Sequence, residues 1–157
     1  MTKKYNSVLV IGMGLIGSSI SRALVEHHVA NSVYGLDSDD KVIKKCQDLN
    51  LLVQGETNLT NFDLQFDLII ICTPLSSYKN IFDSLSEFIS QPTLITDVGS
   101  TKMSTISDFK NAVINNNITF VPSHPIAGLE KSGPEYGFSK LFDNRYCILT
   151  PYEKNDK

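Results

Sequence analysis

The sequence predicts an α/β protein built on a doubly wound parallel sheet with helices on both faces, and three observations support this prediction. Short apolar runs alternate several times with segments whose apolar residues recur at helical spacing, and the connections are short. The run at residues 66–72 does not alternate between polar and apolar, which is typical of a strand buried on both faces. The first apolar run leads directly into a glycine-rich turn and a helical segment.

In the first half of the chain, the pattern predicts strands and helices in strict alternation. A strand at residues 8–11 precedes a helix at 15–28, and a strand at 32–37 precedes a helix at 41–48. Residues 51–53 are expected to form a short third strand, followed by a polar connection at 54–61. The buried strand at 66–72 then ends at Thr73 and Pro74.

The second half continues the alternation. A helix at residues 76–90 ends before Pro92, a strand follows at 93–98, and Ser100 or Thr101 can cap a helix that runs to about Val113. Strands are expected at 118–121 and, last, at 145–150. We therefore expect one domain over residues 1–151, with 152–157 as a polar tail or the start of a linker.

Composition excludes several classes of protein. The 157 residues, 41% of them hydrophobic, fit one domain with a proper core. The net charge of −3 is spread without a basic stripe, which argues against a nucleic-acid partner. No apolar run is long enough to span a bilayer and no signal-peptide pattern precedes the first strand, so no membrane contact and a cytoplasmic location are expected.

The cysteines do not indicate a disulfide framework or a metal site. They are three in number, far apart and without C-x-x-C spacing, so no metal is expected and the thiols should be reduced. Cys72 and Cys147 both fall in predicted strands, so we expect them to be small core residues rather than nucleophiles.

The glycine-rich turn at residues 12–17 has the form G-x-G-x-x-G. Gly12 permits the tight turn, Gly14 lets the backbone approach a pyrophosphate, and Gly17 allows close packing of helix on strand. The free N–H groups and the positive dipole end of the helix would face the same anion. A Rossmann-type dinucleotide site is therefore predicted here, with these cofactor-binding residues: Gly12, Met13, Gly14, Leu15, Ile16 and Gly17.

Asp37 indicates which dinucleotide binds. It ends the second strand about 20 residues after the last glycine, where such folds place the carboxylate that binds the ribose hydroxyls. A carboxylate there repels the 2′-phosphate of NADP, and no arginine follows, so NAD is the predicted cofactor. The alternative is that Asp37 only caps the helix that starts near Asp39.

The topology also predicts where the remaining site residues lie. In a doubly wound sheet, ligands bind beyond the carboxyl ends of the strands. The segments that follow these ends are residues 12–17, 37, 73–74, 99–102 and 123–125, and we expect all of them to line one crevice.

Two polar clusters are not required by the fold. Residues 97–102 read D-x-G-S-x-K, and residues 124–133 read H-P-x-x-G-x-E-x-S-G. Together with the glycine turn, they resemble the nicotinamide domain of the prephenate/arogenate dehydrogenase family over residues 7–151. The resemblance implies an NAD-dependent oxidative decarboxylation of prephenate or arogenate in tyrosine biosynthesis.

The resemblance also implies roles for individual residues. His124 would act as the base that deprotonates the ring hydroxyl, and Ser100 would hydrogen-bond that hydroxyl and orient the histidine. Glu130 would lie at the mouth of the substrate site, and Thr73 and Pro74 would pack under the cofactor's ribose and nicotinamide. The structural alternatives are a histidine satisfied at a strand end, a helix N-cap at Ser100, and a plain turn at Thr73 and Pro74.

Gly99 and Lys102 complete the predicted site. Gly99 follows the strand at 93–98 and is assigned to cofactor binding. Lys102 lies in the first turn of a helix, where a cation is unfavourable unless an anion is near, so it is expected to face a substrate carboxylate or the cofactor. The alternative is an ordinary solvated lysine.

The family implied by the resemblance has a second, mostly helical domain that forms a dimer and binds the substrate carboxylates. We do not expect that domain within residues 1–157, so the partners are a small-molecule substrate and either a second copy or the helical domain. A fragment, a truncated product and a one-domain protein all remain open. Two rival functions are an NAD-binding module without turnover and another hydroxy-acid or imine dehydrogenase with a similar first domain.

Overall fold

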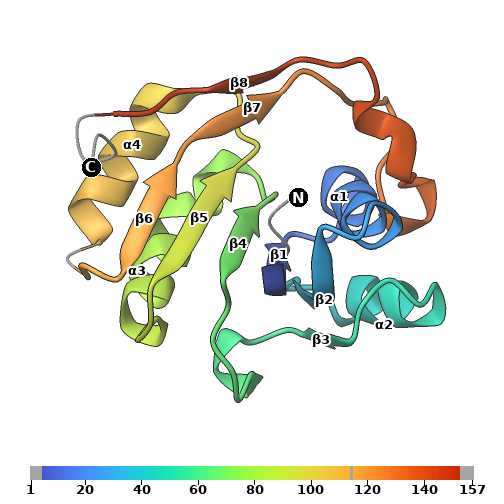
Figure 1. The fold of residues 1–157 in the computed structure, drawn as a ribbon, viewed down its shortest axis with the longest axis horizontal. Coiled ribbons are helices and arrows are strands. Elements are labelled where there is room, and N and C mark those ends of the chain that lie inside the picture. Colours follow the sequence, from blue (N-terminus) through green and yellow to red (C-terminus); the bar gives the residue numbers. More distant parts are fainter. Residues whose placement is uncertain (1–4, 114, 153–157) are drawn as a thin grey trace.

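A six-stranded parallel sheet forms the centre of the computed structural model, which describes residues 5–113 and 115–152. Its strand order is β3-β2-β1-β4-β5-β6, so the direction of winding reverses between β1 and β4 (Figure 1). This confirms the predicted doubly wound, Rossmann-type fold. The strands are β1 (Tyr5–Ile11), β2 (Ala30–Leu36), β3 (Gln54–Glu56), β4 (Leu68–Ile71), β5 (Thr93–Asp97) and β6 (Ile118–Val121).

Helices cover both faces of the sheet because successive residues of its central strands point to opposite sides. Val8 and Val10 of β1 pack in one core layer with Leu24 and Ile43, whereas Leu9 and Ile11 pack in the other. The first layer lies under α1 and α2, and the second lies under α3 and α4 (Figure 1). The helices are α1 (Leu15–Glu26), α2 (Asp40–Asp48), α3 (Tyr78–Phe88) and α4 (Lys102–Ala112), and the short 3-10 helices are η1 (Leu59–Asn61), η2 (Leu75–Ser77), η3 (Pro134–Tyr136) and η4 (Ser139–Phe142).

The third strand differs from the prediction. It covers Gln54–Glu56 rather than residues 51–53, within the segment expected to be a connection. The apolar residues at 51–52 instead pack into the core beside α2, where Leu51 is buried. β3 is an edge strand, and such a strand needs no apolar run. Its side chains are polar, and Gln54 donates a side-chain hydrogen bond of 2.9 Å to Glu56.

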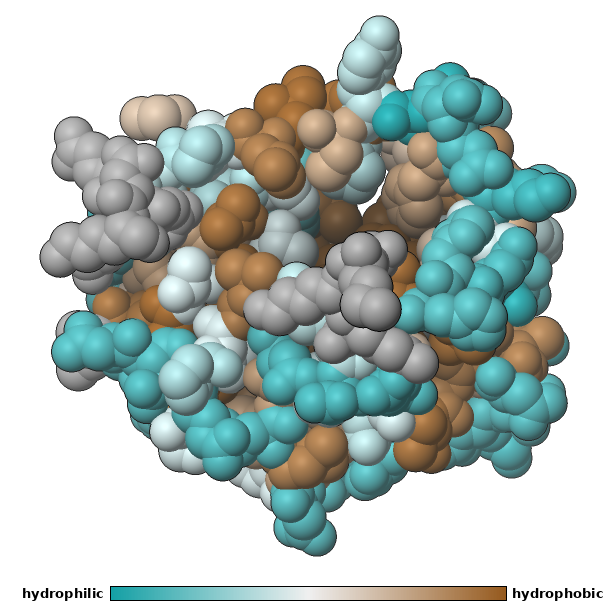
Figure 2. Space-filling model, viewed as in Figure 1, coloured by the Kyte–Doolittle hydropathy of each residue, from teal (hydrophilic) through white to brown (hydrophobic). Residues whose placement is uncertain are grey.

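The last predicted strand does not join the main sheet. β7 (Ser123–Pro125) and β8 (Cys147–Leu149) form a separate antiparallel pair that crosses above β5 and β6 (Figure 1). Because this pair lies outside the two core layers, the expectation of a buried Cys147 was wrong: its side chain is exposed. Ile148 and Leu149 are 53% and 61% exposed, and hydrophobic residues gather along this edge in Figure 2.

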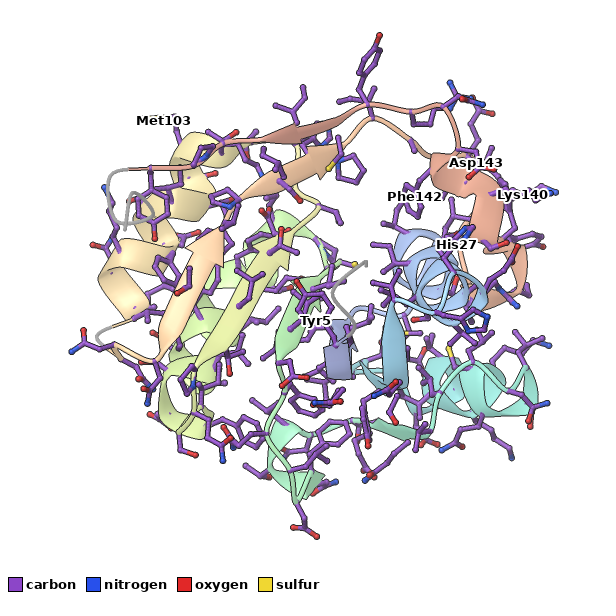
Figure 3. All side chains as sticks on the ribbon, viewed as in Figure 1. Tyr5, His27, Met103, Lys140, Phe142 and Asp143 are labelled. Atoms are coloured by element: carbon purple, nitrogen blue, oxygen red, sulfur yellow. The ribbon has the colours of Figure 1, made fainter. Side chains whose placement is uncertain are left out.

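The segment between β7 and β8 folds back over α1. The N–H of Phe138 donates to the Ser19 hydroxyl at 3.1 Å, and the Arg22 guanidinium donates to the Pro134 carbonyl at 3.3 Å. Phe142 points from η4 toward the space between α1 and the β7–β8 pair (Figure 3). There it helps to line a mainly apolar hollow of about 230 Å³.

Within the described ranges, no helix is both long and apolar enough to cross a membrane.

Candidate active site

The three glycines of the turn meet different surroundings. Gly12 has a φ of +91°, and a Cβ there would lie 2.8 Å from the carbonyl of Cys72. A Cβ on Gly17 would collide with the carbonyl oxygen of Gly12. A Cβ on Gly14 would meet nothing within 4 Å. The fold therefore requires Gly12 and Gly17, whereas the space beside Gly14 is open to a ligand.

The N-terminus of α1 suits an anion. Its N-cap is Gly14, which offers no side-chain cap, and its first turn holds no acidic residue. The first N–H groups of any helix lack intrahelical acceptors, and the dipole leaves a partial positive charge there. In this twelve-residue helix, neither a side-chain cap nor an acidic residue of the first turn offsets that partial positive charge.

Asp37 ties the end of β2 to the glycine turn. Its Oδ2 accepts a hydrogen bond from the Met13 N–H at 2.8 Å, and its Oδ1 accepts one from the Asp39 N–H at 3.0 Å. The N-cap of α2 is Asp39, whose carboxylate accepts from the Lys41 N–H at 2.9 Å. The cap alternative for Asp37 is therefore wrong, and its carboxylate lies beside the turn with lone pairs left for further donors.

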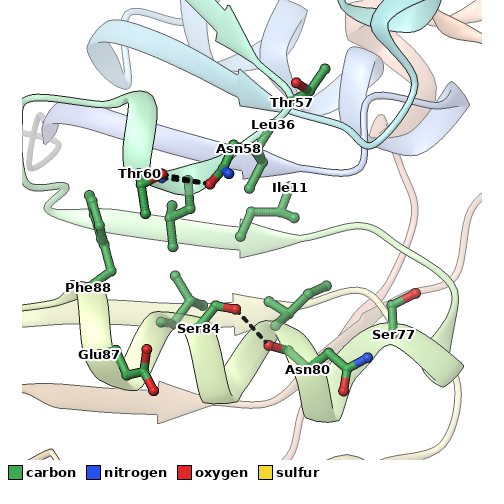
Figure 4. Close-up of a pocket in the computed structure, with 13 residues that line it drawn as sticks. Ile11, Leu36, Thr57, Asn58, Thr60, Ser77, Asn80, Ser84, Glu87 and Phe88 are labelled. Atoms are coloured by element: carbon green, nitrogen blue, oxygen red, sulfur yellow. Dashed lines mark hydrogen bonds between the residues drawn. The ribbon is translucent and has the colours of Figure 1, made fainter.

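A hollow of about 470 Å³ opens beside the ends of β1 and β2 (Figure 4). Ile11 and Leu36, the last residues of β1 and β2, line one side, and Ser77 and Asn80 line the side formed by η2 and α3. Thr57 also borders the hollow, directly after β3. None of these lining residues was predicted from the sequence as part of a site, and Thr57 was overlooked because the third strand was expected three residues too early.

Thr73 supplies an unused hydrogen-bonding group beside the turn. Its methyl group lies against Gly12, where an added Cβ would be 2.9 Å away. Its hydroxyl oxygen is buried and has no hydrogen-bond partner within the described structure. Such an orphan costs about 1–3 kcal/mol, so the site fits a ligand that brings a hydrogen-bonding group. Pro74 follows and is the N-cap of η2.

His124 lies on β7 with a defined ring orientation. Its Nδ1 is 3.2 Å from the carbonyl oxygen of Val98. Because a carbonyl oxygen can only accept, the neutral ring carries its proton on Nδ1, and Nε2 keeps its lone pair. The half-buried histidine thus keeps an accepting ring nitrogen that does not face Val98.

The anion near Lys102 is a carboxylate of the chain itself, that of Asp97. It is the first residue of α4, and its Nζ donates to Oδ2 of Asp97 and to the carbonyl oxygen of Ser123, both at 2.6 Å. Two of its three donors are therefore engaged. Contact between Lys102 and a substrate carboxylate stays a prediction, and only the third N–H is left for it.

The remaining predicted residues are Gly99, Ser100 and Glu130. The N–H of Gly99 donates to Oδ2 of Asp97 at 3.0 Å. Ser100 and Glu130 are exposed. The N-cap of α4 is Thr101 rather than Ser100, and the Thr101 side chain makes no cap hydrogen bond. The hydroxyl of Ser100 is therefore not occupied in capping the helix.

Two groups near the site are poor nucleophiles. Burial raises the pKa of the Cys72 thiol well above its ordinary value, and it also raises the pKa of the Tyr78 hydroxyl. Both groups are therefore neutral at physiological pH, as expected for structural residues. Over the described part of the chain, no cluster of histidine, cysteine and acidic residues could hold a metal ion.

Comparison with known proteins identifies the family of the chain. The family model "Prephenate dehydrogenase, nucleotide-binding domain" matches residues 20–157. The chain is 32% identical to a prephenate dehydrogenase of Bacillus subtilis, with all of the chain and 42% of that protein covered. It is also 32% identical to a cyclohexadienyl dehydrogenase of Zymomonas mobilis, with 94% of the chain and 50% of that protein covered.

A solved structure matches as closely. The prephenate dehydrogenase of Aquifex aeolicus in complex with hydroxyphenyl propionate and NAD⁺ superimposes with a TM-score of 0.90 at 32% identity. The match covers 99% of this chain and 54% of that one. The chain thus spans about half the length, or less, of these relatives.

Proposed function

Because the chain belongs to the family of prephenate dehydrogenase nucleotide-binding domains, we propose that it binds NAD and carries the proton-accepting base of a prephenate or arogenate dehydrogenase. One observation supports this most strongly. A histidine with a free ring nitrogen lies at the same edge of the sheet as an open glycine turn and a helix N-terminus without a cap. A module that only binds a dinucleotide has no need of that histidine.

The cofactor fits the residues that surround the turn. Gly14 and the N-terminus of α1 would hold the pyrophosphate, and Asp37 would accept hydrogen bonds from the adenosine ribose. The hollow beside Ile11 and Leu36 has room for the adenine. The Thr73 hydroxyl would receive a partner from the nicotinamide half. Asp37 favours NAD over NADP by charge repulsion.

The chain's own residues would manage the proton of the reaction. Nε2 of His124 would take the proton of the ring hydroxyl while the ring carbon that bears this hydroxyl loses its hydride. Loss of carbon dioxide from the resulting ketone then leaves an aromatic phenolate, which recovers the proton. Ser100 would donate a hydrogen bond to the same hydroxyl. Bound NAD supplies the hydride acceptor. Since aromatisation drives the reaction, the protein mainly provides position and the base.

Grip on the substrate carboxylates would come mostly from a second, helical domain. Of the two substrate-side residues proposed here, Lys102 has one donor left and Glu130 is exposed at the mouth. The exposed apolar residues of β8 fit a surface that such a domain, or a second copy of the chain, would cover. We propose cytoplasmic tyrosine biosynthesis as the setting, and a domain boundary near residue 151.

The test compares the purified chain with its His124→Asn variant. We measure NAD affinity by calorimetry, and NADH formation with prephenate and arogenate at high concentration. We expect turnover to fall by about 10²–10⁴-fold with NAD affinity unchanged, since the base is lost and the cofactor site is not. Equal turnover in the variant would contradict the role of His124. NAD binding without NADH formation at any substrate concentration would mean that the chain is a nucleotide-binding half that needs its second domain for turnover.

A further inference from the structure

We propose that the buried ion pair between Asp97 and Lys102 positions His124, so that both residues serve the reaction through the backbone of Ser123. The proposal rests on the function proposed above and adds two positioning residues to it. Neither residue needs to touch the substrate or the cofactor for this role.

The pair holds Ser123 at both of its backbone polar groups. Oδ1 of Asp97 accepts a hydrogen bond from the Ser123 N–H at 3.0 Å, and Nζ of Lys102 donates to the Ser123 carbonyl oxygen at 2.6 Å. The two charged groups join each other at 2.6 Å through Oδ2 of Asp97. The Asp97 side chain is fully buried, and that of Lys102 is 14% exposed.

These side-chain hydrogen bonds begin where the backbone pairing of β5 with β6 ends. The pairing of β5 with β6 runs as far as Thr96 and Val121, and Pro122 has no N–H to continue it. The Ser123 hydroxyl donates to the Asp97 carbonyl oxygen at 2.5 Å, which adds a second link to β5 beside the hydrogen bond to Oδ1 of Asp97. Ser123 is thereby held against the end of β5 although it has left the main sheet.

The position of His124 depends on how Ser123 is held. It is the next residue along the chain, and its Nδ1 lies 3.2 Å from the carbonyl of Val98, which directly follows Asp97. A shift of Ser123 relative to β5 would move the ring away from Val98. The proton would then no longer be confined to Nδ1, and Nε2 would lose its fixed role as acceptor.

A second ion pair of the chain provides a contrast. Lys79 and Asp83 are 2.8 Å apart on the surface of α3, with side chains 62% and 44% exposed. Removal of one partner there leaves a solvated charge, whereas removal of Lys102 leaves the buried carboxylate of Asp97 without its cation. Lys79→Met is thus a matched control for substitution of Lys102.

The test uses ¹⁵N NMR of the histidine rings at a pH where they are neutral, with His124 assigned by comparison with His124→Asn. The main variant is the double substitution Asp97→Asn with Lys102→Met, which removes both buried charges at once and so avoids an unpaired one. Asp97→Asn alone keeps the shape of the side chain and is the milder variant. Folding is checked by circular dichroism, and NAD affinity by calorimetry.

We expect His124 of the unchanged chain and of Lys79→Met to carry its proton on Nδ1. In the double variant we expect a mixture of tautomers, with NAD affinity within about twofold and turnover at least tenfold lower. Asp97→Asn should show a smaller tautomer shift. Lys102→Arg should keep the proton on Nδ1, because a guanidinium can also donate to Oδ2 of Asp97 and to the Ser123 carbonyl oxygen.

An unchanged tautomer in folded Asp97→Asn and in the folded double variant would overturn the proposal, whatever the turnover. If the double variant does not fold, an unchanged tautomer in Asp97→Asn overturns it alone. A tautomer shift in chains that do not bind NAD would support the positioning role and contradict the proposed function instead.

Discussion

The glycine turn after β1 and the polar cluster after β5 lie at the same edge of the sheet, yet they are held in different ways. The turn depends on the close approach of backbone to backbone, as where Gly17 packs on the carbonyl of Gly12. The cluster depends on buried side chains, with Asp97 and Lys102 joined to Ser123. One half of the proposed site is thus shaped by the absence of side chains, and the other by their charges.

This difference matters for what a substitution does. In the turn, an added methyl group meets backbone atoms that cannot move aside, so the cost is steric. In the cluster, a lost partner leaves a charge buried, so the cost is electrostatic. The two effects can be separated experimentally, because each has a control position where the same kind of substitution should not destabilise the fold. The control is Gly14 for the turn and Lys79 for the cluster.

The largest effect is expected for Gly17→Ala. Its Cβ would collide with the carbonyl oxygen of Gly12, so we expect a loss of about 3 kcal/mol or more in the free energy of unfolding. Gly14→Ala is the control, because its Cβ would meet nothing within 4 Å. We expect it to cost no more than about 1 kcal/mol, the difference between glycine and alanine at an N-cap. Urea unfolding measures both values.

Gly14→Ala should nevertheless weaken NAD binding at least tenfold, since the methyl group would occupy the space proposed for the pyrophosphate. Equal destabilisation by the two substitutions would contradict the distinction between structural and ligand-facing glycines. Unchanged NAD affinity in Gly14→Ala would place the pyrophosphate elsewhere.

The next largest effect concerns the stability of the cluster. Lys102→Met should lower the free energy of unfolding by about 3–5 kcal/mol, because Asp97 remains buried without its cation. Addition of Asp97→Asn should recover most of this loss. Lys79→Met, at the exposed pair, should cause no measurable change. A double variant as unstable as Lys102→Met would show that the loss comes from packing and not from charge.

The same contrast explains how far the sequence could predict the molecule. The turn is a local motif, so the residues at 12–17 and Asp37 were correctly placed at one strand edge from their spacing alone. The run at 66–72 predicted β4 because burial on both faces leaves a clear signature. The position of Lys102 even indicated a nearby anion. That the anion is Asp97, five residues earlier, depends on the turn between them.

Features that depend on distant contacts were not predictable. Ser123 meets Asp97 across 26 positions of sequence, and no pattern indicates that its backbone is held by side chains. The apolar residues of β8 suggested a core strand, but they lie in an exposed pair outside both core layers. The third strand was misplaced because an edge strand has no apolar signature. Thr57, which follows this strand and lines the hollow, was therefore not predicted as a site residue.

The smallest effect sharpens the comparison without disturbing the fold. Cys46 of α2 is fully buried in the core layer that α1 and α2 cover, and burial, with a smaller contribution from Asp37, raises its pKa from 9.0 to about 11. Cys72 is shifted in the same direction, whereas Cys147 is exposed on β8. At pH 8 we therefore expect one thiol to react rapidly with Ellman's reagent in the native protein, and three after unfolding. Cys147→Ser should abolish the rapid phase, and a remaining rapid thiol would mean that a core layer opens.

The raised pKa of Cys46 also predicts a change in stability with pH. Because the folded value lies above the unfolded one, its contribution is fully present below about pH 9 and is lost as the pH rises through about 11. Unfolding by urea at a series of alkaline pH values should show this decline, and Cys46→Ala should reduce it. Cys147→Ser should leave the decline unchanged, because an exposed thiol is solvated in the folded and unfolded states alike. A decline that depends on Cys147 would instead mean that the β7–β8 pair is covered in solution.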